Sequence, residues 1–347
     1  MLSRNEILGW LRKRNPVRLQ ELWEKADAVR KANVGDAVHL RGLIEFSNEC
    51  VRKCSYCGMN ASNYRLTRYC LTDDEIVACA KTAFERGYGS VVLQSGYNPE
   101  IPMQWLGDII AQIKKSFGLA VTLSIGERTI SELKHLKLMG ADRYLLRFET
   151  SDLGLYQKIK LQKNLKSHPR IRLLQTLREL GYEIGGGIMI GLPGQTYSMV
   201  ARDIELFQKL DLDMVGVGPY IPHPGTILGK QFLMAEENIP GQIPNSALFT
   251  RKVIALTRLA CPQSNIPATT ALANISSNGF IIGLRSGANV IMPNLTPEPF
   301  RSLYSIYPTT SNHIMNYNHF DILDAIAQLN RKPGTGHGGR VKFPAGR

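Results

Sequence analysis

Short apolar segments alternate with longer amphipathic segments along most of the chain. The short segments are rich in Val, Ile, Leu and Gly, and their length is typical of buried strands. The longer segments repeat apolar residues every three or four positions, as one face of a helix requires. The predicted strands are 40–47, 90–96, 120–126, 143–150, 183–192, 214–221, 266–272 and 289–295, and the predicted helices are 72–87, 103–118, 129–140, 168–181, 198–211 and 245–260.

Residues at the helix boundaries support this division. Thr72 and Glu75 have the spacing of a capping box, and glycines follow several helical segments where left-handed caps are common. Strands separated by helices run parallel, so eight such units predict an α/β protein with a (β/α)8 TIM barrel. A doubly wound open sheet is the competing fold. We expect an N-terminal helical extension over 1–37, the barrel over 38–310, and a C-terminal helix with a loosely ordered, glycine-rich basic tail over 311–347.

Composition narrows the class of protein. Hydrophobic residues make up 44% and charged residues 20% of the 347 positions, as in soluble globular proteins. We expect a cytoplasmic protein without a membrane segment, because no apolar run reaches about 20 residues and the N-terminus lacks a secretory pattern. The net charge of +13 is spread along the chain without a nucleic-acid-binding motif. It therefore favours acidic small substrates or an acidic protein partner, and no nucleic acid is expected.

Three of the six cysteines form a cluster directly after the first predicted strand. They are Cys50, Cys54 and Cys57, with spacing x3 and x2. Structural zinc takes four ligands, and no second Cys/His pair follows at a suitable distance. Three cysteines on one loop can instead hold three irons of a 4Fe-4S cluster and leave the fourth iron open to a small ligand. The other cysteines, Cys70, Cys79 and Cys261, are predicted to be small buried residues.

The cysteine spacing, with Tyr56 before the last cysteine, resembles the signature of the radical S-adenosylmethionine (SAM) superfamily. Further segments, including "IEFSN", "VTLSIGE", "GLPGQT", "PHPGT" and "RKPG", resemble the HydE family of FeFe-hydrogenase maturases across residues 38–340. Biotin synthase and the methylornithine synthase PylB are related families. The resemblance implies a (β/α)8 barrel of radical SAM type, in which the open iron binds SAM and SAM cleavage gives a 5′-deoxyadenosyl radical.

The resemblance also implies roles for individual residues. Glu149 would accept a hydrogen bond from the SAM ammonium or ribose, and Arg170 would hold the SAM carboxylate, unless these two residues pair with each other. Tyr56 would lie against the adenine. The implied SAM-binding set is Tyr56, Gln94, Ser95, Glu149 and Arg170, and the implied substrate-binding set is Arg41, Thr122, Ser124, Arg147, Thr269, Thr270 and Tyr304.

Some positions depart from the family pattern. Tyr97 stands where HydE proteins usually have an acidic residue, and Phe148 stands where a histidine is frequent. The expected barrel-strand ends carry no cysteines for a sulfur-donating cluster, and no cysteine follows Cys261. We therefore expect one 4Fe-4S cluster and SAM as the only cofactors.

The resulting hypothesis is a HydE-type maturase for the di-iron subcluster of FeFe hydrogenase. Its substrate would be a small, cysteine-bearing organometallic molecule, its reductant a ferredoxin or flavodoxin, and its partners other maturation proteins. Two alternatives remain. One is a HydE-like or PylB-like radical enzyme acting on an amino acid, and the other is a protein that carries an Fe-S cluster without catalysis.

Overall fold

A computed structural model describes residues 2–234, 241–308 and 318–340. The strands are β1 (Ala37–Ser47), β2 (Ser90–Ser95), β3 (Ala120–Ser124), β4 (Arg143–Leu145), β5 (Glu183–Ile190), β6 (Met214–Pro219), β7 (Val290–Ile291) and β8 (Lys332–Pro333). The helices are α1 (Arg4–Arg12), α2 (Pro16–Val34), α3 (Asp73–Glu85), α4 (Met103–Phe117), α5 (Ile130–Leu138), α6 (Leu153–Lys160), α7 (Pro169–Glu179), α8 (Tyr197–Lys209), α9 (Ile227–Met234), α10 (Ala247–Ala260), α11 (Thr270–Ile275), α12 (Gly279–Leu284), α13 (Glu298–Arg301) and α14 (His319–Ala327).

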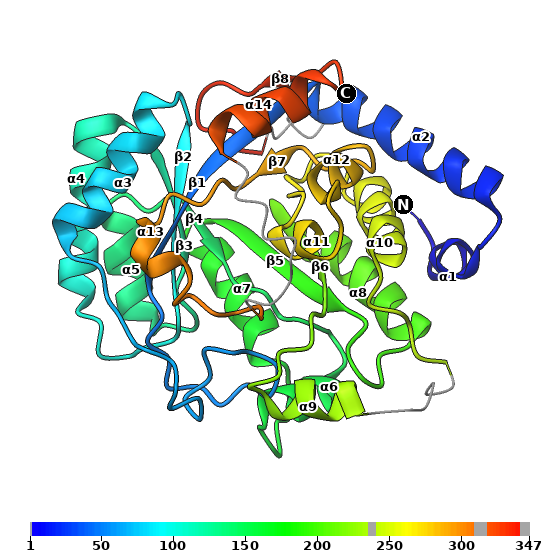
Figure 1. Ribbon diagram of the computed structural model, residues 1–347, viewed down its shortest axis with the longest axis horizontal. Coiled ribbons are helices and arrows are strands. Elements are labelled where there is room, and N and C mark those ends of the chain that lie inside the picture. The colour runs from blue at the N-terminus through cyan, green and yellow to red at the C-terminus, as the bar shows by residue number, and fades with distance from the viewer. Residues whose placement is uncertain (1, 235–240, 309–317, 341–347) are drawn as a thin grey trace.

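The strands form one curled parallel sheet with helices on its outer side (Figure 1). The strand order is β6-β5-β4-β3-β2-β1-β7, and β8 pairs with the beginning of β1. Consecutive strands from β1 to β6 are neighbours, as βαβ units with helical crossovers produce. The predicted barrel fold of the (β/α)8 type is therefore confirmed.

The last part of the barrel differs from the prediction. The segment 266–272 is not a strand, because Thr269 caps helix α11 by accepting a hydrogen bond from the backbone of Leu272. The sheet is joined across this side by two isolated bridges, Met214 with Asn265 and Pro267 with Val290. The predicted strand at 289–295 is reduced to the two residues of β7. Likewise, β4 ends at Leu145, and the chain rejoins the sheet through one bridge at Glu149.

The helix-boundary predictions hold. Thr72 and Glu75 form both hydrogen bonds of a capping box at the start of α3. Gly118 has a left-handed backbone (φ 63°) at the end of α4, where a side chain would be strained. None of the described helices is long and apolar enough to cross a membrane.

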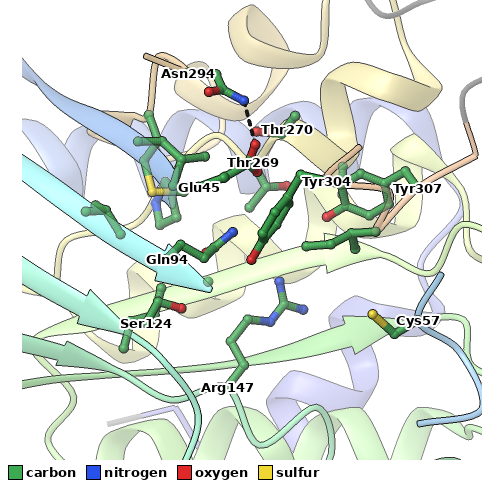
Figure 2. Close-up of a pocket in the computed structure, with 18 of the residues that line it drawn as sticks. Glu45, Cys57, Gln94, Ser124, Arg147, Thr269, Thr270, Asn294, Tyr304 and Tyr307 are labelled. Atoms are coloured by element: carbon green, nitrogen blue, oxygen red, sulfur yellow. Dashed lines mark hydrogen bonds between the residues drawn. The ribbon is translucent and has the colours of Figure 1, made fainter. Parts of the chain in front are cut away.

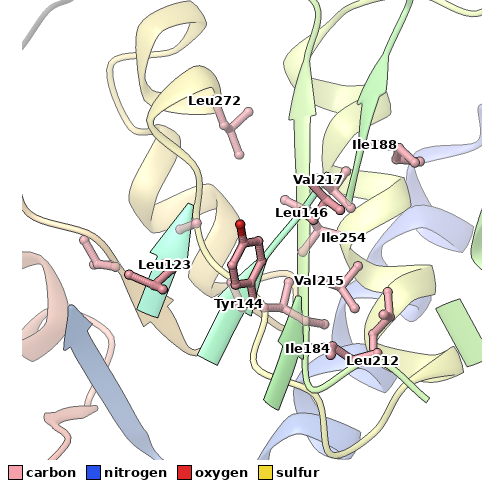
Figure 3. Close-up of a cluster of buried hydrophobic side chains, with 14 of the residues drawn as sticks. Leu123, Tyr144, Leu146, Ile184, Ile188, Leu212, Val215, Val217, Ile254 and Leu272 are labelled. Atoms are coloured by element: carbon pink, nitrogen blue, oxygen red, sulfur yellow. The ribbon is translucent and has the colours of Figure 1, made fainter. Parts of the chain in front are cut away.

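A continuous hydrophobic core lies between the sheet and the surrounding helices. Figure 3 shows part of it, where Ile184, Val215 and Val217 from β5 and β6 lie near Ile254 of α10. Each of these side chains is fully buried, which stabilises the fold by about 1.5–3 kcal/mol per residue. The sheet is thereby fixed as a rigid frame for the side chains that point inward.

The C-terminal segment closes the end of the barrel where the strands begin. The prediction of a loosely ordered tail is wrong for the described residues 331–340. The backbone of Gly334 donates to Val38 (2.8 Å), and the Gly338 carbonyl accepts from Arg41 and Asn265 (3.0 and 3.1 Å). The His337 carbonyl accepts from Arg143 (2.8 Å). We call this closure, made by residues 332–340, the barrel floor.

Candidate functional site

One cavity of about 600 Å³ runs through the inside of the barrel. It extends from the cysteine loop, at the ends of the strands, down to Arg41 near the barrel floor. The structure brings all of the residues predicted from the sequence together in its lining: Arg41, Cys50, Cys54, Tyr56, Cys57, Gln94, Ser95, Thr122, Ser124, Arg147, Glu149, Arg170, Thr269, Thr270 and Tyr304. Their predicted roles remain predictions.

The cysteine loop is held in place by hydrogen bonds to its own backbone and to α6. The guanidinium of Arg68 donates to the carbonyls of Asn48, Met59 and Asn60 at 2.8–2.9 Å. Ser55 donates through both its backbone and its hydroxyl to the carbonyl of Ile159 (2.9 Å each). A loop without regular structure can therefore present its thiols in a defined arrangement.

The three cysteine thiols lie at the mouth of the cavity. Burial, followed by the charge of Cys54, raises the pKa of Cys57 to about 12, so the site disfavours several thiolates without a compensating cation. Lys160 supplies one cation, with its Nζ 3.4 Å from the sulfur of Cys54. The irons of a cluster would supply more positive charge, so the thiol set fits an iron–sulfur group. Within the described ranges, no three His, Cys, Asp or Glu side chains converge as a single-ion site requires.

Glu149 and Arg147 form an ion pair on the cavity wall below the cysteines. The Glu149 Oε2 atom lies 3.0 Å from Nη2 of Arg147, which also donates to the carbonyl of Ile188 (2.8 Å). Glu149 has a left-handed backbone (φ 65°), which is uncommon for a residue other than glycine. Such strain persists only where the surrounding structure enforces it, and it often marks a functional position.

Arg170 pairs with Glu127 and not with Glu149. Its Nε donates to Glu127 (2.8 Å), and its Nη1 donates to the carbonyl of Arg147 (2.6 Å). Burial opposes the charged form of Arg170, but the Glu127 carboxylate raises its pKa above the ordinary value. In the same way, burial would raise the pKa of Glu127, but Arg170 lowers it to about 2. The alternative that Arg170 and Glu149 pair with each other is therefore wrong.

Tyr56 lies beside Lys160 at the cysteine end. The Lys160 ammonium donates to the Tyr56 hydroxyl (2.7 Å) and lies 5.1 Å from the ring centroid. Burial, followed by the charge of Cys54, raises the pKa of Tyr56 well above its ordinary value, so the phenol stays neutral. One face of a fixed aromatic ring at this place suits stacking with a flat heterocycle.

Deeper in the cavity the lining is polar but mostly neutral. Strand register aligns Glu45 of β1 with Gln94 of β2, and Gln94 with Ser124 of β3, so these residues lie at one level. Figure 2 shows Gln94, Ser124, Thr269 and Tyr304 around the same space. This level offers hydrogen-bonding groups to a ligand that enters below the cysteines.

Two predicted substrate residues lie lower. The Thr122 hydroxyl is buried without a hydrogen-bond partner among the described residues, so it can donate to a ligand. Arg41 is already engaged, because it donates to Gly338 of the barrel floor and contacts the sulfur of Met214 (2.8 Å). Burial, followed by the charge of Arg143, lowers the pKa of Arg41 to about 9, which leaves it cationic at neutral pH.

Four of the residues that sequence reasoning missed bear directly on the charges and shape of the site. Glu45, Lys160 and Tyr307 line the cavity, and Glu127 pairs with Arg170. Glu45 and Glu127 stand in the segments "IEFSN" and "VTLSIGE", so the polar ends of predicted strands carried a usable signal. Lys160 lies in a helix after β4 and had no local signal.

The two departures from the family pattern lie in different surroundings. Tyr97 lines the cavity mouth, where its ring centroid is 4.2 Å from the Arg52 guanidinium. Phe148 is fully buried outside the cavity, with its ring against His168 (6.0 Å) and Phe207 (5.8 Å). Phe148 therefore does not contact the cavity contents directly. Cys79 and Cys261 are buried as predicted, whereas the prediction is wrong for Cys70, which is exposed.

Comparisons with known proteins agree with this geometry. The family model for the radical SAM superfamily matches residues 44–207, which include the cysteine loop and strands β2 to β5. The crystal structure of methylornithine synthase (PylB) superposes with a TM-score of 0.80 and 25% identity, covering 96% of this chain and 94% of that chain. A structure of the FeFe-hydrogenase maturase HydG superposes at a TM-score of 0.76 and 18% identity, covering 96% of this chain and 73% of that one, and shows the fold alone.

Sequence relatives narrow the assignment. The 3-methylornithine synthase of Methanosarcina acetivorans is 29% identical over 293 residues, which cover 84% of this chain and 79% of the relative. The FeFe hydrogenase maturase subunit HydE of Thermotoga maritima is 43% identical over 328 residues, which cover 93% of this chain and 89% of the relative. With that identity over nearly the whole length and the cysteine loop at the mouth of the barrel, the chain belongs to the HydE family of radical SAM enzymes.

Proposed function

We propose that this chain is a maturase that helps to assemble the di-iron subcluster of FeFe hydrogenase. The observation that carries the proposal is the 43% identity to a HydE protein over 93% of the chain. The cavity supports it, because the cofactor end and the inner level line one continuous space. SAM held at the cysteine loop would therefore lie next to a substrate held below it inside the barrel.

The family implies a 4Fe-4S cluster and SAM, and we propose that this chain holds one cluster. When reduced, such a cluster supplies the electron that cleaves SAM to methionine and a 5′-deoxyadenosyl radical. Cys50, Cys54 and Cys57 hold three irons in this proposal. Cys70, Cys79 and Cys261 lie apart from the cavity lining and supply no further ligand set.

The residues around the cysteine loop bind and orient SAM in this proposal. Arg170 holds the SAM carboxylate through charge-assisted hydrogen bonds, and Glu127 keeps its guanidinium charged and fixed. Glu149 accepts from the ammonium or a ribose hydroxyl, and Gln94 with Ser95 lines the adjacent wall. Tyr56 lies against the adenine, where Lys160 fixes its ring.

The inner level binds the substrate, which we take to be a small cysteine-bearing organometallic iron molecule. Arg147 presents a cation to its anionic groups, and Ser124, Thr269 and Thr270 present hydroxyls. Thr122 and Arg41 lie beneath them. A ferredoxin or flavodoxin would supply the electron from outside, and other maturation proteins would deliver or accept the small molecule. The barrel limits at 38 and 310 also remain a proposal.

The proposal is tested by anaerobic reconstitution with iron and sulfide, followed by dithionite and SAM. We expect four irons per chain and formation of 5′-deoxyadenosine, measured by liquid chromatography. Addition of the purified chain to a maturation mixture lacking its HydE component should restore hydrogenase activity. Formation of 5′-deoxyadenosine without that restoration would contradict the maturase assignment.

A second candidate function is a radical reaction on an amino acid. The 29% identity to 3-methylornithine synthase over 84% of the chain favours it as the alternative. Turnover of free amino acids without complementation of maturation would support it. A third candidate, a carrier of Fe-S clusters, predicts a bound cluster but no 5′-deoxyadenosine.

A further inference from the structure

A carboxylate on β1 faces the inner level of the cavity and has no role in the function described so far. Glu45 lines the cavity and is 8% exposed. Its Oε2 accepts a hydrogen bond from the amide of Asn294 (2.8 Å), which Figure 2 shows as a dashed line. Strand register places Glu45 directly beside Gln94, at the level where the substrate is proposed to bind.

Glu45 has no ionic partner within 4.0 Å among the described residues. The other buried carboxylate of the cavity wall, Glu149, is paired with Arg147. Arg301 also lines the cavity and its charge acts on Glu45, but Arg301 is exposed, its Nε donates to the carbonyl of Thr296 (2.6 Å), and it forms no ion pair with Glu45 within 4.0 Å. Among the described residues, Glu45 is therefore a buried acid whose carboxylate is held by one amide.

A carboxylate in this position is costly unless a cation or donor completes its surroundings. Burial raises the pKa of Glu45 to about 7, although the Asn294 amide and the charge of Arg301 act in the opposite direction. The phenols of Tyr69, Tyr304 and Tyr307 also feel its charge, and burial raises the pKa of each, so they remain neutral and add no cation. A ligand that brings a positive charge would stabilise the carboxylate form.

We propose that Glu45 is a specificity residue that accepts hydrogen bonds from the primary ammonium group of the substrate. The inference rests on the proposed function, because a cysteine-bearing molecule carries an amino group as well as a carboxylate. Arg147 and the hydroxyls of the inner level suit the carboxylate, whereas Glu45 suits the ammonium. Opposite charges on two walls would fix the orientation of an amino acid below SAM.

Gln94 and Tyr304 strengthen this assignment. Both line the cavity near Glu45, and each has an oxygen that can accept a hydrogen bond. An ammonium group has three donors, so one carboxylate and two neutral oxygens can satisfy it. A substrate without the amino group would leave the buried acid in its present, incompletely satisfied state.

The experiment measures calorimetric binding of three probes to the protein loaded with cluster and SAM. The probes are S-methyl-L-cysteine, 3-(methylthio)propionate, which lacks the amino group, and 2-(methylthio)ethylamine, which lacks the carboxylate. None has a free thiol that could bind iron. The wild-type protein should bind S-methylcysteine at least about tenfold more tightly than the propionate, because a polar site discriminates against a ligand that leaves it unpaired.

The variant Glu45→Gln keeps the size of the side chain and removes its charge. It should reduce that preference to about threefold or less while changing the affinity for the propionate little. Asp203→Asn is the matched control, because burial also raises the pKa of Asp203 to about 7, but Asp203 lies outside the cavity lining. Its preference should equal that of the wild-type protein.

Two results would overturn the inference. One is a wild-type protein that binds none of the probes or shows no preference for the amino group. The other is a Glu45→Gln protein with the wild-type preference. If Glu45→Gln does not fold, as judged by lost SAM binding, Glu45→Asp is measured in its place and should also weaken the preference, and a wild-type protein without preference still overturns the inference. Formation of 5′-deoxyadenosine is measured separately, so failure of the proposed radical function does not affect the result on Glu45.

Discussion

The arginines that line the cavity at the two ends of the barrel are held in different ways. At the cysteine end, Arg170 and Arg147 pair with the carboxylates Glu127 and Glu149. At the floor, Arg41 donates to a backbone carbonyl of the C-terminal segment. The carboxylates raise the pKa values of the upper arginines against the effect of burial, whereas burial lowers the pKa of Arg41.

The difference indicates two roles for arginine in this fold. An arginine fixed by a carboxylate keeps further donors in a defined direction, so it can bind a carboxylate of a cofactor at little cost in reorganisation. Arg41, which donates to a carbonyl 297 positions away, ties two distant chain segments together at the closed end of the cavity. The cysteine end is therefore suited to binding and releasing ligands, whereas the floor is suited to keeping that end of the barrel closed.

The largest expected effect on cluster and SAM chemistry comes from removing a thiol at the cysteine end. Cys54→Ala should abolish 5′-deoxyadenosine formation and prevent a stable four-iron cluster, because two cysteines do not hold three irons. Iron content and product formation measure it. Cys70→Ala is the control, since Cys70 is exposed and lies outside the cavity lining. A Cys54→Ala protein that keeps about four irons would contradict the ligand assignment.

A smaller effect is expected from replacing Arg170, the arginine at the same end that pairs with Glu127. Arg170→Met should weaken SAM binding about 10- to 100-fold, the loss typical of a charge-assisted hydrogen bond. Equilibrium binding to the cluster-loaded protein measures it. Arg172→Met, an exposed position two residues along α7, is the control and should bind SAM normally. Equal affinity of both variants would remove Arg170 from the SAM site.

The smallest effect on SAM is expected at the floor, where a change should alter stability instead. Gly338 and Gly336 both have left-handed backbones (φ 58° and 65°), but a Cβ at Gly338 would lie 2.6 Å from the ring of His39, whereas Gly336 has open space. Gly336→Ala should lower the free energy of unfolding by about 1 kcal/mol through backbone strain. Gly338→Ala should lower it by about 2–4 kcal/mol, since the overlap adds to the strain.

Denaturant unfolding of the two variants gives these free energies. SAM affinity should be unchanged in both, because the floor lies at the opposite end of the cavity from the cysteines. Equal stability of the two variants would show that the closure contributes nothing beyond the local backbone.

The fold was predictable where strands are long and continuously apolar. The segments that became β1, β2, β3, β5 and β6 met that condition, and their helical crossovers implied the parallel barrel. The segment at 266–272 did not, because a short apolar run is compatible with a strand or a helix. Thr269 caps α11, so the residues after it are helical. The alternation of apolar and polar segments gives no indication of this cap.

The site was predictable as a set of residues but not as a set of pairs. The cysteines, Glu149, Arg170 and the inner hydroxyls all proved to line one cavity. The partner of Arg170 was not predicted, because Glu127 lies 43 positions away on the loop after β3. Lys160, which lies 106 positions from Cys54, gave no local indication of its place beside the thiols.

The sequence by itself determined the cysteine loop, the strand that precedes it and the barrel class. These features depend on spacing and periodicity within a few residues, and local chemistry is enough to define them. Only the tertiary structure decided which charges meet, that Glu45 faces the cavity without an ion-pair partner among the described residues, and that the C-terminal segment closes the floor. Such contacts join residues up to 297 positions apart, and they are possible only because the curled sheet brings these distant residues together.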